Sequence, residues 1–244
     1  MTRHRLDELL VQRGLYSSRS RARDAIARGT VIVDGIVAAK PAQNTGLESR
    51  IEILDEARDY VSRSALKLKS GINFFNISVK GLNCLDIGAS TGGFTQVLLE
   101  QGAVHVTAID VGHGQFDASL QNDPRVTSIE GLNSRDLTPA HLAHAIDLIV
   151  CDVSFISLKL ALPAALSIAE PGTRLVALIK PQFEAGRDAV ARGGIVSDPH
   201  EHERVCKEIS EFLTAENWRV LGITPSSIEG GDGNQEFLIA AVKS

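Results

Sequence analysis

The chain has 244 residues, a net charge of −5 and 43% hydrophobic side chains, a composition typical of a folded protein rather than a disordered or fibrous one. Its three cysteines, Cys84, Cys151 and Cys206, are far apart and form no C-x-x-C pair, which argues against a zinc ribbon or a disulfide scaffold. Apolar runs are shorter than a membrane span and no signal-peptide core is present, so we expect a cytoplasmic protein with no membrane partner.

Charge is unevenly distributed along the chain. Residues 1–47 contain eight basic and four acidic side chains, a balance of +4, which leaves −9 for the remainder because the whole chain carries −5. A basic segment attached to an acidic body suggests that the N-terminal part binds a polyanion.

The first 55 residues have the pattern of a small α+β domain. Apolar side chains at helical spacing predict helices over 5–14 and 19–28, the second capped by Ser17 or Ser18 and ended by Gly29. A D-G pair between two apolar runs predicts a hairpin over 30–38, and residues 51–53 form a further strand. The second helix carries arginines at the edges of its apolar face, where they can pair with phosphates.

The remaining sequence alternates apolar strands with helices. We expect strands over 82–85, 104–109, 125–129, 146–151 and 174–179, and helices over 62–76, 94–101, 158–169 and 201–216. Residues 183–199 are predicted to form a long mobile loop, and two last strands, 218–225 and 236–242, flank a glycine-rich turn. This alternation predicts an α/β fold with a parallel, doubly wound sheet, in which ligands bind at the carboxyl ends of the strands.

A glycine-rich turn follows the first of these strands. Gly88, Gly92 and Gly93 allow the backbone to bend sharply and to approach a ligand closely. Asp110 ends the next strand 22 residues after Gly88, close to the roughly 20 that precede a ribose-binding acid in nucleotide-binding units. The turn lacks G-x-G-x-x-G, and Asp86 stands before it, which suits S-adenosylmethionine, a cofactor with a cationic end and no phosphates. On spacing alone, a glycine turn of another α/β fold remains the alternative.

Residues 3 to about 55 resemble the S-four RNA-binding domain. The resemblance rests on R-L-D-E-L-L-V-Q-R-G and on S-R-S-R-A-R-D-A-I-A-R-G-T-V-I-V-D-G. It implies that RNA is bound by one serine and by the basic side chains of this segment, namely Arg3, Arg5, Arg13, Ser18, Arg19, Arg21, Arg23, Arg28 and Lys40.

Almost the whole chain resembles the TlyA (haemolysin A) family of ribosomal RNA 2′-O-methyltransferases, which is related to the FtsJ class. The motifs are S-R-S-A-L-K, D-I-G-A-S-T-G-G-F, C-D-V-S-F-I-S-L, I-K-P-Q-F-E-A-G-R and N-Q-E-F-L. The resemblance implies a Rossmann-like S-adenosylmethionine-dependent methyltransferase sheet. It divides the chain into an S-four-like domain (1–57), a linker (58–61) and an FtsJ-like domain (62–244).

The same resemblance implies the site residues. The family's Lys-Asp-Lys-Glu tetrad falls on Lys67, Asp152, Lys180 and Glu236. The cofactor would be bound by residues of the glycine turn and the following strand ends, namely Asp86, Gly88, Ala89, Ser90, Gly92, Gly93, Phe94, Asp110, Val111, Asn133 and Asp152. Thr91 and the loop 131–135 depart from the patterns of related members, so the adenine contacts follow less directly than the tetrad.

The residue types of the tetrad suit the methylation of a ribose hydroxyl, which is a poor nucleophile until its proton is removed. A free lysine has a pKa of about 10.4, so only about 1 in 2,500 is neutral at pH 7. Desolvation and a second nearby lysine favour the neutral form. We expect Lys180 to act as the base, Lys67 to orient the hydroxyl, Glu236 to hold Lys67, and Asp152 to position the hydroxyl against the methyl group.

The resemblance implies a cytidine of ribosomal RNA as the target. The short N-terminus is similar to that of family members that modify the large subunit only. Two alternatives are a non-catalytic RNA-binding or ribosome-assembly factor and a membrane-active haemolysin, which a liposome-leakage assay would detect. The histidine pairs His141/His144 and His200/His202 lack a third ligand nearby, so the sequence predicts no metal site. The oligomeric state and the exact nucleotide do not follow from the sequence.

Overall fold

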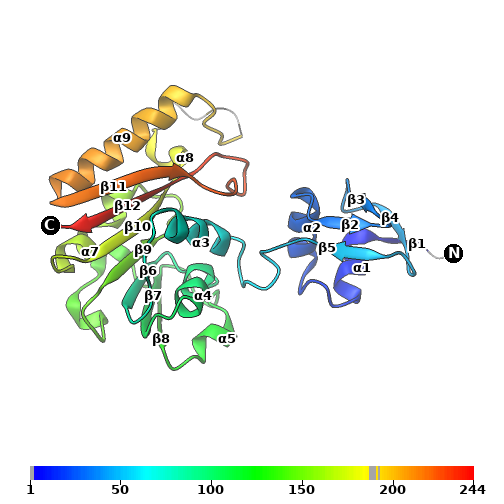
Figure 1. Cartoon of the computed structure of the whole chain (residues 1–244), viewed down its shortest axis with the longest axis horizontal. Coiled ribbons are helices and arrows are strands. Elements are labelled where there is room, and N and C mark those ends of the chain that lie inside the picture. Colours follow the sequence, from blue (N-terminus) through cyan, green and yellow to red (C-terminus); the bar gives the residue numbers. More distant parts are fainter. Residues whose placement is uncertain (1–2, 187–190, 192) are drawn as a thin grey trace. The chain divides into compact units, whose positions relative to one another are not determined.

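The computed structural model describes residues 3–186, 191 and 193–244, which divide into two compact units, Met1–Asp59 and Tyr60–Ser244 (Figure 1). Each unit has its own hydrophobic core. Among the described residues, no helix is both long and apolar enough to cross a bilayer.

The first unit contains the two helices that the sequence predicts, α1 (Leu6–Gln12) and α2 (Arg19–Ala27). Ser18 is the N-cap of α2 and accepts a hydrogen bond from the Arg21 backbone N–H, as expected for a serine at this position. The hairpin β2 (Val31–Val33) and β3 (Ile36–Val37) pairs with β5 (Ile51–Ile53) in the order β3-β2-β5. A second pairing, β1 (Arg3–Arg5) with β4 (Asn44–Gly46), was not expected, because neither strand has an alternating apolar pattern.

The second unit is built on a seven-stranded sheet with the order β11-β12-β10-β9-β6-β7-β8 (Figure 1). Its parallel strands are β6 (Asn83–Ile87), β7 (His105–Asp110), β8 (Val126–Glu130), β9 (Leu148–Cys151) and β10 (Arg174–Ile179). The C-terminal strands β11 (Trp218–Pro225) and β12 (Phe237–Lys243) add an antiparallel edge. The strand order reverses between β6 and β9, so the ligand crevice of such a sheet is expected where these two strands end.

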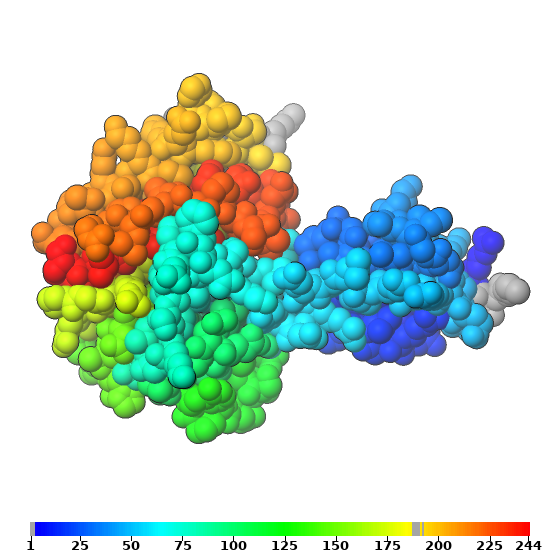
Figure 2. Space-filling model, in the orientation of Figure 1, coloured from blue at the N-terminus to red at the C-terminus, as the bar shows by residue number. Residues whose placement is uncertain are grey.

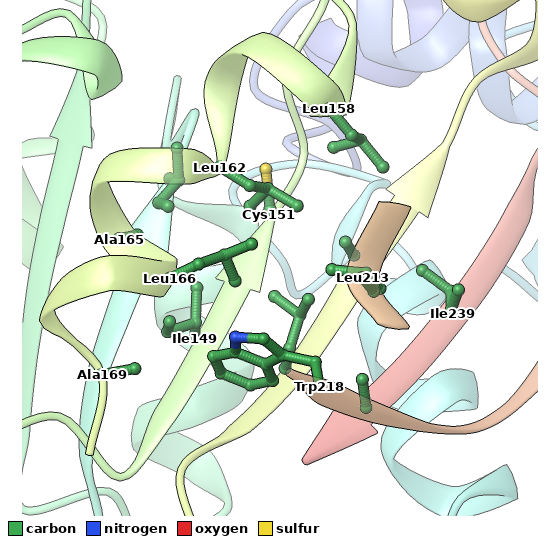
Figure 3. Packing of buried hydrophobic residues seen from close by; sticks show 14 of the residues in the cluster. Ile149, Cys151, Leu158, Leu162, Ala165, Leu166, Ala169, Leu213, Trp218 and Ile239 are labelled. Carbon is green, nitrogen blue, oxygen red and sulfur yellow. The ribbon is translucent and has the colours of Figure 1, made fainter. Parts of the chain in front are cut away.

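Helices cover both faces of this sheet. The helices α3 (Ala65–Phe74) and α4 (Gly93–Glu100) pack on one face, where Val150 and Val176 are buried. On the other face, α6 (Leu158–Ala161), α7 (Pro163–Ile168) and α9 (Pro199–Ala215) pack against Ile149 and Ala177. Trp218 lies in this second core among side chains of α7 and α9 (Figure 3). Burial on both faces explains why these strands are almost wholly apolar.

Two helices differ from the sequence predictions. The helix expected over 158–169 is divided into α6 and α7, because Pro163 has no backbone N–H and begins a new helix at its first position. By contrast, the expected loop 183–199 contains no helix or strand over its described residues 185–186, 191 and 193–198; only its ends lie in α8 (Pro181–Glu184) and at the start of α9, and its residue Val196 is buried. Residues 187–190 and 192 of that loop lie outside the described part of the chain. The second difference is the short helix α5 (Ala118–Gln121), which was missed.

Candidate active site

The four tetrad residues lie at one rim of the sheet. Asp152 directly follows β9, and Lys180 directly follows its parallel neighbour β10. In the antiparallel pair β10–β12, Ile179 is opposite Phe237, so one further step of the same register places Lys180 opposite Glu236. Strand order therefore brings Glu236, Lys180 and Asp152 side by side, although they are far apart in the sequence.

The tetrad forms two ion pairs. The Lys67 Nζ atom, from α3, lies 2.5 Å from Glu236 Oε2, and the Lys180 Nζ atom lies 2.6 Å from Asp152 Oδ1. Lys67, Lys180 and Glu236 are buried. The formal charges of two lysines and two carboxylates cancel, which is the arrangement that burial of charged side chains requires.

The sequence did not assign a role to Ser154, which is part of the same cluster. Its Oγ atom accepts a hydrogen bond of 3.0 Å from Lys180 Nζ. Ser154 stands two residues after Asp152, so the turn that follows β9 holds Lys180 from two sides. Ser154 belongs to the motif C-D-V-S-F, but serine is common in turns, so the motif alone did not identify it as a site residue. Its contact with Lys180 does.

A cavity of about 490 Å³ opens next to the tetrad at the ends of β6, β7 and β9. This volume falls within the range of roughly 300–1,000 Å³ that is typical of small-molecule sites. Apolar side chains form much of its wall, and a few polar groups converge on it, as in a nucleoside site. Its lining includes these predicted cofactor-binding residues: Gly88, Ser90, Asp110, Val111, Asn133 and Asp152.

A smaller cavity of about 160 Å³ connects this region to the Asp152–Lys180 pair. It is lined by Lys180 together with Ser62 and Ser64, which precede α3. The predicted residues Ala89 and Phe94 also line it. Both cavities share Gly88, Ser90, Asp152 and Ser154, so a ligand in the larger cavity can reach the tetrad.

Gly88 allows the two central strands to approach each other at this point. Its φ is +80°, and a Cβ atom there would lie 2.5 Å from the backbone oxygen of Asp152. Any other residue would therefore separate the ends of β6 and β9. Because Gly88 lines both cavities, the wall at this point is bare backbone, which a ligand can approach closely.

Three predicted cofactor-binding residues line neither cavity. Asp86 is completely buried, and its Oδ2 atom accepts a 2.6 Å hydrogen bond from the Thr95 hydroxyl of α4. A Cβ atom on Gly92 would meet Leu120, and one on Gly93 would meet the Ser64 hydroxyl, so both glycines allow close packing of the chain. These three residues therefore support the conformation of the glycine turn by packing within the protein, rather than by lining the cavities.

Asp110 and Glu130 organise the loop beside the larger cavity. Asp110 accepts hydrogen bonds from the backbone N–H groups of Ser90 (2.8 Å) and Gly112 (2.7 Å). Glu130, at the end of β8, accepts bonds from the N–H groups of residues 114, 115 and 116. These bonds hold the pKa of Glu130 below its ordinary value. Glu130 was overlooked, although an acid at a strand end is the same signal that identified Asp110.

In the first unit, several of the predicted RNA-binding side chains have partners within the protein. Arg28 forms two hydrogen bonds with the buried Asp55, and Arg19 pairs with the buried Asp7, as does Arg5. Arg13 and Arg21 donate to backbone carbonyl groups. Three others are exposed and, within the described chain, belong to no ion pair: Arg3, Arg23 and Lys40.

The chain matches two family models. Residues 60–243 match the FtsJ-like methyltransferase family, and residues 4–51 match the S4 domain. The chain is 44% identical to the 16S/23S rRNA (cytidine-2'-O)-methyltransferase TlyA of Mycobacterium tuberculosis over 238 residues, which cover 97% of this chain and 89% of that protein. It is 36% identical to the 23S rRNA (cytidine-2'-O)-methyltransferase TlyA of Campylobacter jejuni, with 80% and 75% covered.

A solved structure from Streptococcus thermophilus that carries a hemolysin name superposes with a TM-score of 0.79. It is 39% identical and covers all of this chain and 90% of its own. The fold, the family models and the relatives therefore indicate the same family as the sequence motifs, over almost the whole chain. The chain therefore belongs to the TlyA family of FtsJ-like methyltransferases that carry an N-terminal S4 domain.

Proposed function

We propose that this enzyme transfers a methyl group from S-adenosylmethionine to the ribose 2′-hydroxyl of a cytidine in ribosomal RNA, with the large subunit as substrate. The observation that carries the proposal is the pair of lysine–carboxylate contacts at the rim of the sheet formed by the ends of β9 and β10 and the start of β12, next to a cavity of cofactor size. Both TlyA relatives described above are named for 23S rRNA and for a cytidine 2′-hydroxyl.

The larger cavity has the groups that S-adenosylmethionine requires. Asp110 would accept hydrogen bonds from the ribose hydroxyls, because each of its oxygens has a lone pair beyond the one used for a backbone N–H. Val111 and Asn133 would contact the adenine ring from the end of β7 and the loop after β8. When bound, this cofactor supplies a methyl group on a positively charged sulfur.

Calorimetry tests the cofactor assignment. S-adenosylmethionine should bind to the intact protein, and Asp110→Asn should weaken binding about tenfold or more, because a ribose hydroxyl loses a charged acceptor. NAD should bind much more weakly, since the turn lacks its pyrophosphate fingerprint. Preferential binding of NAD, or no binding of S-adenosylmethionine, would contradict the assignment.

At the rim, the chain's own side chains would prepare the hydroxyl. Asp152 and Lys180 are held together and face the smaller cavity, so a ribose hydroxyl there would lie within reach of both. Lys180, in its neutral amine form, would accept the hydroxyl proton as the methyl group is transferred, with Asp152 fixing its position. Lys67 would orient the hydroxyl, and Glu236 would hold Lys67. In-line positioning contributes most of the rate in this scheme.

Substitution of Lys180 tests this division of roles. In single-turnover methyl transfer to ribosomal subunits, Lys180→Ala should lower the rate by a factor of about 100 or more while leaving cofactor and RNA affinity unchanged. Lys180→Arg should not restore the rate, because a guanidinium stays protonated. Lys159, which pairs with Glu208 at 2.7 Å and lines neither cavity, is the matched control. A Lys180→Arg protein with the wild-type rate would show that only positive charge is needed.

We also propose that residues 1–57 form the RNA-binding domain, joined by 58–61 to the catalytic domain. Arg3, Arg23 and Lys40, which are exposed and form no ion pair within the described residues, support direct contact with phosphates. The remaining predicted residues, Arg5, Arg13, Ser18, Arg19, Arg21 and Arg28, would act by maintaining the shape of this surface as well as its charge.

A further inference from the structure

The turn between β11 and β12 ends at the catalytic carboxylate Glu236. Across its base, the backbone N–H of Ser226 donates to the Glu236 carbonyl oxygen at 2.8 Å. Across its middle, the N–H of Gly230 donates to the Asn234 carbonyl oxygen at 2.9 Å. The turn lies beside α3, which carries Lys67, and the Ser227 hydroxyl donates to the carbonyl oxygen of Leu66 (Figure 2). Hydrogen bonds therefore fix the conformation of the turn on both sides of Gly230.

Gly230 packs directly against the Glu236 carboxylate. A Cβ atom at Gly230 would lie 2.6 Å from Glu236 Oε1 and 3.3 Å from its Cδ atom. The other oxygen, Oε2, receives Lys67 Nζ at 2.5 Å. Glu236 is only 2% exposed, so its carboxylate is confined between the bare backbone of Gly230 and the Lys67 ammonium.

Asn234 fixes the same turn from the outside. It is completely buried, and its side chain accepts from the Val196 N–H and donates to the Gly194 carbonyl oxygen, each at 2.9 Å. The Val196 carbonyl oxygen contacts His202 Nε2 of α9 at 2.8 Å. Asn234 thus attaches the turn to a segment about 40 positions away, and through it to a helix of the second core.

We propose that Gly230 and Asn234 are positioning residues for methyl transfer. The missing side chain at Gly230 sets the place of the Glu236 carboxylate, Glu236 sets the place of the Lys67 ammonium, and Asn234 keeps the turn in this conformation. The inference rests on the proposed function, because it concerns the geometry of the same tetrad. It assigns function to two residues that line neither of the two cavities described above and act through Glu236.

The adjacent glycines of the turn provide a matched pair of variants. Neither Gly230 nor Gly231 has a positive φ, so an alanine is compatible with the backbone at both positions. A Cβ atom on Gly231 would find its nearest neighbour, Arg63 Nη2, at 3.8 Å, an ordinary contact. Gly230→Ala should lower the single-turnover rate by about 10- to 100-fold, because a displacement of about 1 Å in a catalytic group has that effect. Gly231→Ala should stay within about twofold of wild type.

Further readouts separate positioning from damage to the fold. The melting temperature and the KM values for RNA and S-adenosylmethionine should be nearly unchanged in Gly230→Ala, so that the loss falls on kcat. In a Glu236→Ala background the partner of the clash is gone, and Gly230→Ala should then have no further effect. If Gly230→Ala folds poorly, Asn234→Ala replaces it: this variant adds no atom near Glu236, should lower kcat more mildly, and should also lose its effect in the Glu236→Ala background.

The outcomes that overturn the inference are distinct from those that overturn the methyltransferase assignment. A wild-type protein that transfers no methyl group in this assay overturns both. An active wild type with an equally active Gly230→Ala protein overturns the inference alone. Equal losses from Gly230→Ala with and without Glu236 would also overturn it, because the effect would then not pass through the carboxylate.

Discussion

Asp86 illustrates how burial changes the chemistry of a single carboxyl group. It is completely buried, and burial together with the charges of Asp152 and Asp110 raises its pKa to about 7, against the opposing hydrogen bonds from Thr95. The folded protein therefore holds this proton at pH values where the unfolded chain, with an ordinary pKa near 4, has released it. The contribution of Asp86 to the free energy of unfolding is fully present below about pH 4 and is lost as the pH rises through about 7.

Asp86→Asn should remove this contribution to the pH dependence. The difference in unfolding free energy between wild type and variant should change between about pH 4 and pH 7, by at most about 1.4 kcal/mol per pH unit, with wild type relatively more stable at the acidic end. Urea unfolding at several pH values measures it. If the unfolding free energies of the two proteins change with pH in parallel, Asp86 does not titrate in this range.

We expect Glu130 to influence cofactor binding through the backbone rather than by contact. Glu130→Ala removes the acceptor of three N–H groups and should release the loop 112–116, which lines the larger cavity through Gly112 and Gln115. We expect S-adenosylmethionine to bind roughly tenfold more weakly by calorimetry, the effect of about one such charged hydrogen bond. The surface substitution Glu203→Ala on α9 is the control, and equal affinities of the two variants would contradict this role.

At the scale of elements, the close approach of β6 and β9 depends on one glycine. Gly88 and Gly81 have almost the same φ, +80° and +81°, but a Cβ atom on Gly81 would have no neighbour within 4 Å. Gly81→Ala should therefore cost only the strain of a left-handed residue, about 1–2 kcal/mol, and leave cofactor binding unchanged. Gly88→Ala adds a collision with the Asp152 carbonyl and should weaken cofactor binding more than tenfold. Calorimetry and denaturant unfolding of both variants separate strain from collision.

At the scale of the whole molecule, the arginines of the first unit divide into two groups. Arg23 is exposed and unpaired within the described chain, whereas Arg28 holds Asp55, whose side chain is 1% exposed. Burial works against the charge of Asp55, but the hydrogen bonds from Arg28 and Tyr16 outweigh it and hold the pKa of Asp55 below its ordinary value. One arginine is therefore available for RNA, and the other stabilises the unit.

Glutamine substitutions should separate these two groups. Arg23→Gln should weaken RNA binding and lower the slope of log K against log salt by about 0.7–0.9 for one lost phosphate contact, without changing the melting temperature. Arg28→Gln should destabilise the first unit by about 3 kcal/mol, because Asp55 loses its ion-pair partner. Binding titrations over a range of salt and thermal unfolding measure both effects. An unchanged salt slope in Arg23→Gln would place the phosphate contacts elsewhere.

The sequence by itself determined the fold class and the order of most elements, whereas the tetrad was implied by the resemblance to a family. The fold class and the elements depend on local patterns: apolar runs for strands, caps and glycines for helix ends, and polar residues such as Asp110 and Lys180 directly after strands. Local patterns failed where one residue overrides its neighbours, as Pro163 does between α6 and α7. They also failed where pairing stabilises a weak strand, as in β1 and β4.

Only the tertiary structure showed that Lys180 pairs with Asp152 and how the charges are brought together, whereas the pairing of Glu236 with Lys67 was already expected from the resemblance. Lys67 and Glu236 are 169 positions apart, and their contact depends on β12 running antiparallel beside β10, which no local pattern specifies. The same holds for Gly230, whose importance comes from the carboxylate beside it rather than from its own turn. A hydrogen bond or a close approach depends on distances of a few tenths of an ångström between distant segments, and those distances are set by the packing of the whole sheet.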